Sequence, residues 1–391
     1  MKRTIIFLMV IFAAFSAFAY NMNIPGTPFN SINKAYVPTD AAESNYVTYA
    51  LFKDPTVLSG GKFSLALPSV SVTQYNTSSF LSSDAGSELA SDIVNLRFSE
   101  IDKNRLISAL YTIVDNLGVG YNDLIDVDVN AGAAGNNWVI GVNARVSTDL
   151  WSESGAGTDA QIKPMLDLTG GFGFNIGLIE NDSFNLNLAV VTKFAFRAYT
   201  LSDITASSIE SFNIDDEIIC SGWAVPVDVA LGTELYNKTL RFTLSATNLN
   251  GYYYMAKHEN YKAAINIKDG DEGYTEYTPW SLNAAVIFDP DIPVIDPKIR
   301  VELVDIYNFV LNKDGNEEIM SHLNIGAEVK ILNFLSVKGA LNAGYWQVGA
   351  GLDIAGNNIS LLYGWHEAGD MLGYKPVDSL TLRVTLGYDG N

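Results

Sequence analysis

The feature that most constrains this chain is a series of stretches in which apolar and small polar residues alternate with a period of two. This period places every apolar side chain on one face of a β-strand and every polar side chain on the other. A two-faced strand of about ten residues is long enough to cross a bilayer when it is tilted. In residues 323–331 the apolar members are Leu323, Ile325, Ala327, Val329 and Ile331.

Fourteen strand-like stretches follow one another along the chain. They are predicted at residues 62–74, 124–134, 138–149, 165–179, 184–200, 218–236, 239–250, 279–288, 298–310, 321–332, 334–342, 345–355, 358–366 and 379–388. The links after even-numbered stretches are mostly tight and contain Asn or Gly, which supply the positive φ of two-residue turns. The links after odd-numbered stretches are mostly long. Residues 289–297 and the short link after 334–342 are the exceptions.

This alternation of link lengths is typical of an outer-membrane barrel, which has an even number of strands, short turns at one rim and long loops at the other. A membrane sheet must also close, because the bilayer core cannot hydrogen-bond a free strand edge. The sequence therefore predicts an all-β fold, a closed antiparallel transmembrane β-barrel of about 14 strands. A soluble sandwich or β-solenoid is the alternative, because either would show the same alternation with one buried face.

The polar face of the stretches indicates a wet lumen. It consists mainly of Gly, Ser, Thr and Asn, with scattered charged residues. An Arg or Lys turned to lipid at mid-depth costs about 2–4 kcal/mol, so these charges are expected to point into the lumen. The charged residues in question are Lys193, Arg197, Arg241, Glu328 and Arg383.

The N-terminus has the pattern of a secretory signal peptide. Lys2 and Arg3 precede an apolar segment at 5–15, and Ala17-Phe18-Ala19 matches a cleavage site. Residues 1–19 are therefore predicted to be removed near Ala19, and the mature chain is expected in the cell outer membrane. An uncleaved membrane anchor is the alternative.

Two segments depart from the strand pattern. Residues 20–61 have no sustained period and are predicted to form an N-terminal hatch or plug, with 62–391 as the barrel. Residues 75–123, after the first strand, are predicted to form a helical insertion, because apolar residues recur there at helical spacing. This stripe would line a ligand pocket if the helix folds into the lumen, pack on a neighbour, or simply anchor the loop. It consists of Ile107, Leu110, Tyr111 and Val114.

Composition argues against several functions. The net charge of −20 argues against nucleic acid as a partner. The single cysteine, Cys220, excludes an intrachain disulfide and a thiolate metal cluster. No catalytic motif is found, and His258, His322 and His366 are far apart in the sequence. The acidic segments 269–272 and 314–318 are better explained as solvated loops than as a cation site. No enzyme activity, cofactor or metal is therefore expected.

The N-terminal third resembles the FadL-like outer-membrane family, and more closely its PorV and TraF-like branches. About forty irregular residues precede the first strand, and Asp54-Pro55-Thr56 stands where the family has an Asn-Pro-Ala segment leading into that strand. The order of 67–72, the helical pattern at 101–117 and residues 123–130 resembles the strand–helix–strand opening of TraF-like members. Asp54 and Thr56 depart from the family's Asn and Ala.

The resemblance implies a plugged barrel that takes up or captures small hydrophobic molecules such as long-chain fatty acids. The expected partners are outer-membrane lipid and a hydrophobic small molecule, with a possible protein partner at the long loops. The alternative function is a non-transporting barrel that serves as a structural or secretion and conjugation partner. Kinks at Pro68 or Pro226 are candidates for a gap in the wall.

Overall fold

The computed structural model describes residues 50–51, 55–58, 63–78, 87, 120–152, 161–181, 184–200, 204–205, 217–236, 239–265, 271–290, 292, 294–306, 319–332, 334–354, 357–367, 373 and 376–388. The hatch residue Asp54 and the pocket residues Ile107, Leu110, Tyr111 and Val114 lie outside this set, as does nearly all of 1–61 and the predicted insertion.

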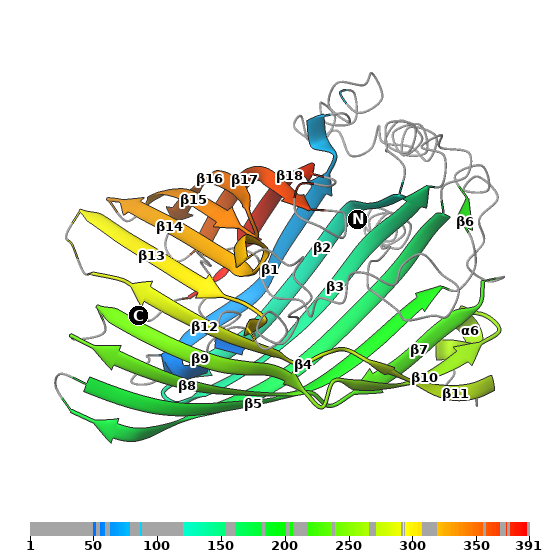
Figure 1. Cartoon of the computed structure of the whole chain (residues 1–391), viewed down its shortest axis with the longest axis horizontal. Coiled ribbons are helices and arrows are strands. Elements are labelled where there is room, and N and C mark those ends of the chain that lie inside the picture. Colours follow the sequence, from blue (N-terminus) through cyan, green and yellow to red (C-terminus); the bar gives the residue numbers. More distant parts are fainter. Residues whose placement is uncertain are drawn as a thin grey trace.

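The described residues form one antiparallel sheet that closes on itself (Figure 1). Its strands are β1 (Ser64–Tyr75), β2 (Gly120–Gly135), β3 (Trp138–Ser152), β4 (Gln161–Glu180), β5 (Phe184–Thr200), β6 (Ile204–Thr205), β7 (Ile219–Ala224), β8 (Val227–Leu235), β9 (Leu240–Leu249), β10 (Tyr252–His258), β11 (Asp271–Tyr277), β12 (Ser281–Phe288), β13 (Ile295–Leu303), β14 (Leu323–Ile331), β15 (Leu335–Asn342), β16 (Tyr345–Ile354), β17 (Asn357–Glu367), β18 (Pro376–Thr385) and β19 (Gly387–Tyr388). The helical segments are η1 (Pro55–Leu58), α6 (Tyr261–Ile265) and η4 (Ile319–His322).

These strands make a barrel with 14 positions around its wall. We call each position a stave, and a stave is either one strand or two collinear strands. Four staves consist of two collinear strands each, namely β7 with β8, β9 with β10, β11 with β12, and β18 with β19, because both members pair with the same neighbouring stave. The short β6 adds only to the end of β4. Pairing of β1 with β18 and β19 closes the ring, so the predicted closed 14-strand barrel is confirmed.

In this wall the apolar face is exposed and the polar face is buried, which is the reverse of a sheet in a soluble protein. Large apolar side chains point outward, with Val142 58% exposed and Phe194 57% exposed. Polar side chains on the other face are buried, with Asn187 at 0% and Lys338 at 4% exposure. A soluble sandwich would bury the apolar face, so the alternative fold is wrong for this chain.

Outward aromatic residues gather in two bands around the barrel, as in the girdles of membrane barrels. Toward the rim with long links, Phe194, Trp223 and Tyr254 form one run of ring contacts. Trp346, Tyr363 and Trp365 form another on the same rim. Toward the rim with short turns, the exposed aromatic residues are Phe63, Tyr236, Phe288 and Phe334.

Residues with a positive φ occur at the short turns. Asn137 has the expected positive φ of 68° between β2 and β3. At the turns after β8 and β14, Tyr236 (53°) and Leu332 (53°) also have a positive φ, and the predicted turn residues Asn237 and Asn333 lie outside the described residues.

Two predicted boundaries are wrong. The stretch predicted at 298–310 ends as β13 at Leu303, because Asp305 adopts a left-handed backbone conformation, with φ 54°, and its N–H donates to Asn283 Oδ1 at 3.0 Å. Residues 251–278 were predicted as a long loop, but β10 and β11 extend the hairpin through much of it. Asn250-Gly251 reads as a turn in the sequence, although the alternation resumes immediately after it.

Candidate ligand path through the barrel

The inner wall of the barrel is lined by charges that are paired across neighbouring strands. Arg197 Nε lies 2.9 Å from Asp167 Oδ1, and Arg241 Nη2 lies 2.6 Å from Glu234 Oε1. Lys193 pairs with Asp228 in the same way. Lys338 and Glu328 (3.5 Å) continue the pattern between β15 and β14, whereas Arg300 and Glu302 (2.8 Å) are two residues apart on the same strand, β13. The prediction that Lys193, Arg197, Arg241 and Glu328 face the lumen is confirmed.

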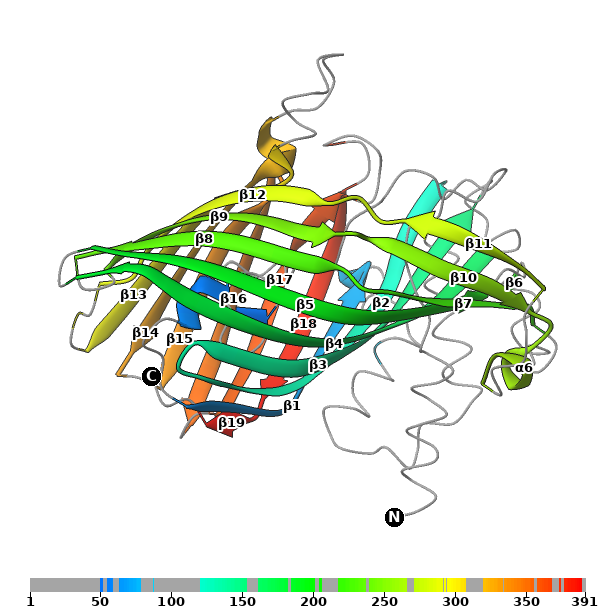
Figure 2. The same cartoon turned by 90° about the horizontal axis from the view of Figure 1, so that it is seen from below.

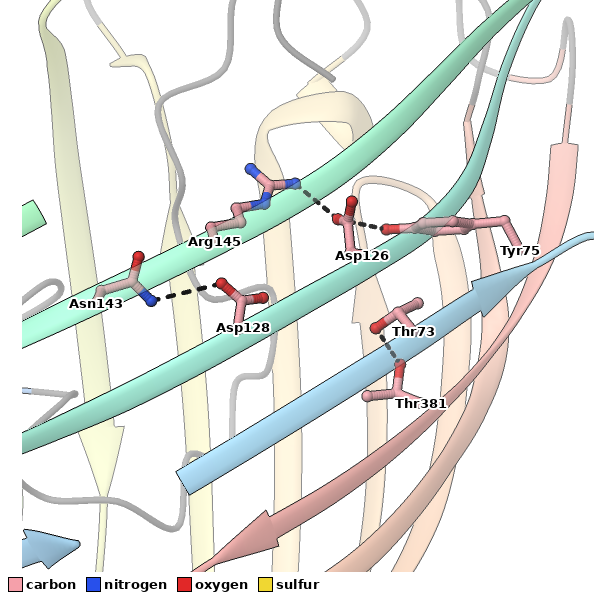
Figure 3. A network of polar contacts seen from close by, with 7 residues as sticks. All are labelled: Thr73, Tyr75, Asp126, Asp128, Asn143, Arg145 and Thr381. Atoms are coloured by element: carbon pink, nitrogen blue, oxygen red, sulfur yellow. Dashed lines mark hydrogen bonds and ion pairs between the residues drawn. The ribbon is translucent and has the colours of Figure 1, made fainter. Parts of the chain in front are cut away.

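Where the first strand meets its neighbours, the wall is held by a polar network (Figure 3). Tyr75 Oη donates to Asp126 Oδ2 at 3.0 Å, and Arg145 Nη2 donates to the same oxygen at 2.6 Å. Asn143 Nδ2 reaches Asp128 at 3.5 Å. Thr73 bonds Thr381 across the closing pair of strands at 2.9 Å. This part of the lumen wall is polar and offers no apolar surface to a ligand.

An apolar patch on the inner wall lies near the short-turn rim, and we call it the hatch patch. It is formed by Ala50, Leu51, Val57, Leu58, Ala66, Ala134, Val139 and Val191. Four of these residues belong to the described N-terminal segment, which lies inside the ring of strands (Figure 2). Leu58 O accepts a hydrogen bond from Asn137 N at 3.0 Å, which ties η1 to the β2–β3 turn.

Glycines in the wall make room for this segment. A Cβ built on Gly171 would lie 2.8 Å from Leu51 Cδ1, and one built on Gly232 would lie 2.2 Å from Thr56 Oγ1. Only a residue without a side chain therefore allows η1 so close to β8. Of the predicted hatch motif, Pro55 and Thr56 begin η1.

A second apolar patch lies on the inner wall toward the long-link rim, and we call it the rim patch. It is formed by Met165, Ala195, Tyr199, Cys220, Ala224, Tyr253 and Met255, with Tyr274 packed against them. The strand registers place these residues on one face of β4, β5, β7, β10 and β11. Lys193, Arg197 and Asp167 share that face.

The polar atoms of the rim patch are arranged around Tyr199. Its hydroxyl group bonds both the Tyr274 hydroxyl and Glu276 Oε1. The other carboxylate oxygen, Glu276 Oε2, is buried and has no hydrogen-bond partner. Beside it, the Arg197 guanidinium lies 4.3 Å from the centroid of the Tyr253 ring. The patch thus combines apolar side chains, tyrosine rings and one unsatisfied acceptor.

Between the two patches, three adjacent staves are interrupted at nearly the same level, and we call this the strand break. It comprises residues 225–226, 250–251 and 278–280, and the strands bend there (Figure 1). Main-chain bonds and asparagine side chains bridge it. Thr278 N donates to Gly251 O at 2.8 Å, and Lys193 N donates to Pro226 O at 2.9 Å. Asn248 Nδ2 donates to Thr278 O at 2.8 Å and to Pro279 O at 3.2 Å, and Asn250 Nδ2 donates to Val225 O at 3.1 Å. The predicted kink at Pro226 falls in this break.

The other predicted kink lies where the barrel closes. The register between β1 and β2 shifts between Ala66 and Ser69, around Pro68. Leu67 N donates to Leu386 O at 2.9 Å, opposite the interruption between β18 and β19. The main chain is bonded across this point, so Pro68 marks a bulge in a paired seam.

The histidines are separated in space. His258 ends β10, rather than lying in a loop as predicted, and its Nε2 is 3.1 Å from Ser221 Oγ. His322 Nδ1 lies 3.0 Å from Val304 O, and the ring of His366 lies 4.6 Å from that of Tyr75. Within the described ranges no group of three His, Cys, Asp or Glu residues could hold a metal ion.

The sequence did not single out the rim patch. Tyr199, Tyr253, Tyr274 and Glu276 come from strands that are far apart in the chain, and only the barrel brings them together. A signal was present in Tyr253 and Met255, which alternate with outward Tyr252 and Tyr254. Following that period beyond Gly251 would have extended the hairpin and placed both residues in the lumen.

No protein-family model matches the chain, and no curated protein matches it. Among solved structures it is similar to the Pseudomonas putida toluene transporter TodX, with a TM-score of 0.44 and 10% identity over 89% of this chain and 95% of that one. It is also similar to the CymD monoaromatic hydrocarbon channel, with a TM-score of 0.43 and 8% identity over 88% of this chain and 93% of that one. A Pseudomonas aeruginosa FadL homologue gives a TM-score of 0.38 and 10% identity over 88% of this chain and 94% of that one.

In the part of the chain that the structure describes, no helix has the length and apolar character needed to span a membrane.

Proposed function

We propose that this chain is an outer-membrane barrel that takes up or captures small hydrophobic molecules. The observation that carries the proposal is the pair of apolar clusters inside an otherwise charged barrel, one near each rim. Their buried members are at most 6% exposed, so a hydrophobic molecule would enter by displacing side chains that now pack on one another. Such a molecule needs apolar surface to leave water. The outward apolar band is the surface that such a barrel would place in lipid.

The proposed path begins at the rim patch and continues toward the hatch patch. The strand break lies between them and is the candidate for lateral exit, because three staves are joined there by isolated main-chain bonds and asparagine side chains instead of an unbroken ladder. The N-terminal segment would act as the hatch at the short-turn rim. Removal of residues 1–19 and kinship with the PorV and TraF-like branches remain predictions, and long-chain fatty acids are one candidate ligand among several.

Uptake by cells whose outer membrane contains lipopolysaccharide tests the proposal, because that membrane resists hydrophobic solutes. Cells that carry the chain should accumulate a radiolabelled hydrophobic probe faster than cells that lack it. Equal rates would reject transport and leave the alternative, a structural or secretion partner, which co-purification of a specific protein from intact outer membranes would support.

The hatch is tested by Gly232→Ala. The new methyl group would lie 2.2 Å from Thr56 Oγ1 and 2.6 Å from Thr56 Cβ, so η1 must move. We expect faster passage of small polar solutes through reconstituted barrels, measured by liposome swelling. The control is Gly339→Ala, because a Cβ there meets nothing within 4 Å. Unchanged swelling in a folded Gly232→Ala barrel would mean that η1 does not obstruct the lumen.

A further inference from the structure

The rim patch contains a feature that plain hydrophobic uptake does not require. Its tyrosines and methionines surround a carboxylate, and Glu276 Oε2 is buried without a hydrogen-bond partner while Oε1 accepts from Tyr199. A buried acceptor that is left unpaired costs about 1–3 kcal/mol. In an apolar setting, the group that relieves this cost is a hydrogen-bond donor.

The surroundings of Glu276 restrict the kind of donor. The positive charge of Arg197 is already engaged by Asp167 and lies over the Tyr253 ring, so it is not available to an anionic ligand. A carboxylate ligand would face Glu276 without compensation. The partly buried ring of Tyr274, which packs against the cluster that contains Met165 and Met255, favours contact with an aromatic ring.

We propose that the rim patch selects small aromatic molecules that carry a neutral hydroxyl group, that is, phenols, and that this hydroxyl donates to Glu276 Oε2. The selection rests on the proposed uptake function and refines it. Fatty acid anions and other carboxylates are disfavoured at this patch, and pure hydrocarbons enter it without the hydrogen bond.

Three ligands of similar size test the proposal without any change to the protein. p-Cresol carries a hydroxyl donor and is neutral at pH 7, because a phenolic group has a pKa near 10. 4-Methylanisole has the same ring but cannot donate, and p-toluate is an anion. In the whole-cell uptake assay, the part of the rate that depends on the barrel should be about tenfold higher for p-cresol than for 4-methylanisole, which corresponds to about 1.4 kcal/mol. It should be lowest for p-toluate.

Glu276→Leu removes the acceptor, so in this variant the barrel-dependent rates for p-cresol and 4-methylanisole should become equal. Thr73→Val is the matched control, because Thr73 bonds Thr381 in the closing pair of strands and takes no part in the rim patch. It should keep the preference. Folding of each variant is checked by its heat-modifiable mobility in gels.

The outcomes separate the two claims. If the chain accelerates p-cresol and 4-methylanisole equally, the selection of phenols is wrong and hydrophobic uptake stands. If none of the three enters faster than in cells that lack the chain, both proposals fail. If a folded Glu276→Leu variant keeps the preference for p-cresol, the donor binds elsewhere and the role of Glu276 is rejected.

Discussion

At the scale of single residues, the inner wall depends on charges that are buried together. Lys338 and Glu328 occupy opposite positions of β15 and β14, and their side chains are 2% and 4% exposed. A buried charge that loses its partner keeps its desolvation cost and gains nothing in return. By contrast, the pair of Lys298 with Asp289 is 38% and 40% exposed and should contribute little.

We expect Lys338→Met to lower the free energy of unfolding by about 3–5 kcal/mol, because Glu328 would remain buried and unpaired. Urea unfolding of the detergent-solubilised barrel measures this loss. The double variant Lys338→Met with Glu328→Leu should recover most of it, and Lys298→Met should change stability by less than about 1 kcal/mol. A single Lys338→Met variant as stable as the parent would contradict this account.

At the scale of elements, the strand break is the place where the wall is least continuous. Asn248 and Asn250 have positive φ values of 60° and 61°, which Asn tolerates better than most residues. Their side chains add bonds across the break beside the main-chain bonds from Thr278 N to Gly251 O and from Lys193 N to Pro226 O. The staves above the break, β10 and β11, are therefore joined to the rest of the barrel partly through these amides.

Asn248→Ala should loosen β10 and β11 relative to the barrel below. It removes the bonds to Thr278 O and Pro279 O and places Ala in a left-handed conformation. With a loss of about 1–3 kcal/mol, amide hydrogen exchange in peptides that cover these two strands should speed up about 5- to 150-fold. Asn248→Gly isolates the loss of the side chain, and Asn357→Ala, which removes a bond to Ile354 O in an exposed turn, serves as the control. Unchanged exchange would show that the amide bonds do not hold the break.

At the scale of the whole molecule, the alternation of link lengths assigns an orientation. Outer-membrane barrels place short turns in the periplasm and long loops outside. Asn136 lies in an exposed short turn, and Glu259 is exposed at the long-link rim after β10. The native thiol of Cys220 is 0% exposed and should not interfere, and Cys220→Ser removes it altogether.

In that background, Glu259→Cys should react with a membrane-impermeant maleimide in intact cells. Asn136→Cys should react only after the outer membrane is permeabilised. Mass spectrometry of the labelled chain measures both. The reverse pattern would invert the barrel and place the rim patch on the periplasmic side, which would contradict the proposed direction of uptake.

Much of the fold followed from local pattern alone. The period of two located 14 staves and fixed which face of each is apolar, because successive side chains of a strand point to opposite sides. It also predicted that charges such as Arg197 and Glu328 face inward. It failed where a turn-like dipeptide interrupted a stave, as at Asn250-Gly251, and where a left-handed residue such as Asp305 ended a strand early.

The candidate site was less accessible to prediction. Pro55 and Thr56 were singled out and begin η1, whereas the stripe of Ile107, Leu110, Tyr111 and Val114 lies outside the described residues. The rim patch was not predicted, because its members are spread from Met165 to Tyr274 and each alone is an ordinary residue of a strand.

The sequence by itself determined that this chain forms amphipathic strands with an apolar and a polar face, since that property depends only on near neighbours in the chain. The tertiary structure alone decided which side chains share the lumen: that Tyr199 meets Glu276, that Gly232 admits Thr56, and that three staves break at one level. These contacts depend on strand register and barrel closure. Register and closure set distances between residues far apart in the chain, and local periodicity does not specify them.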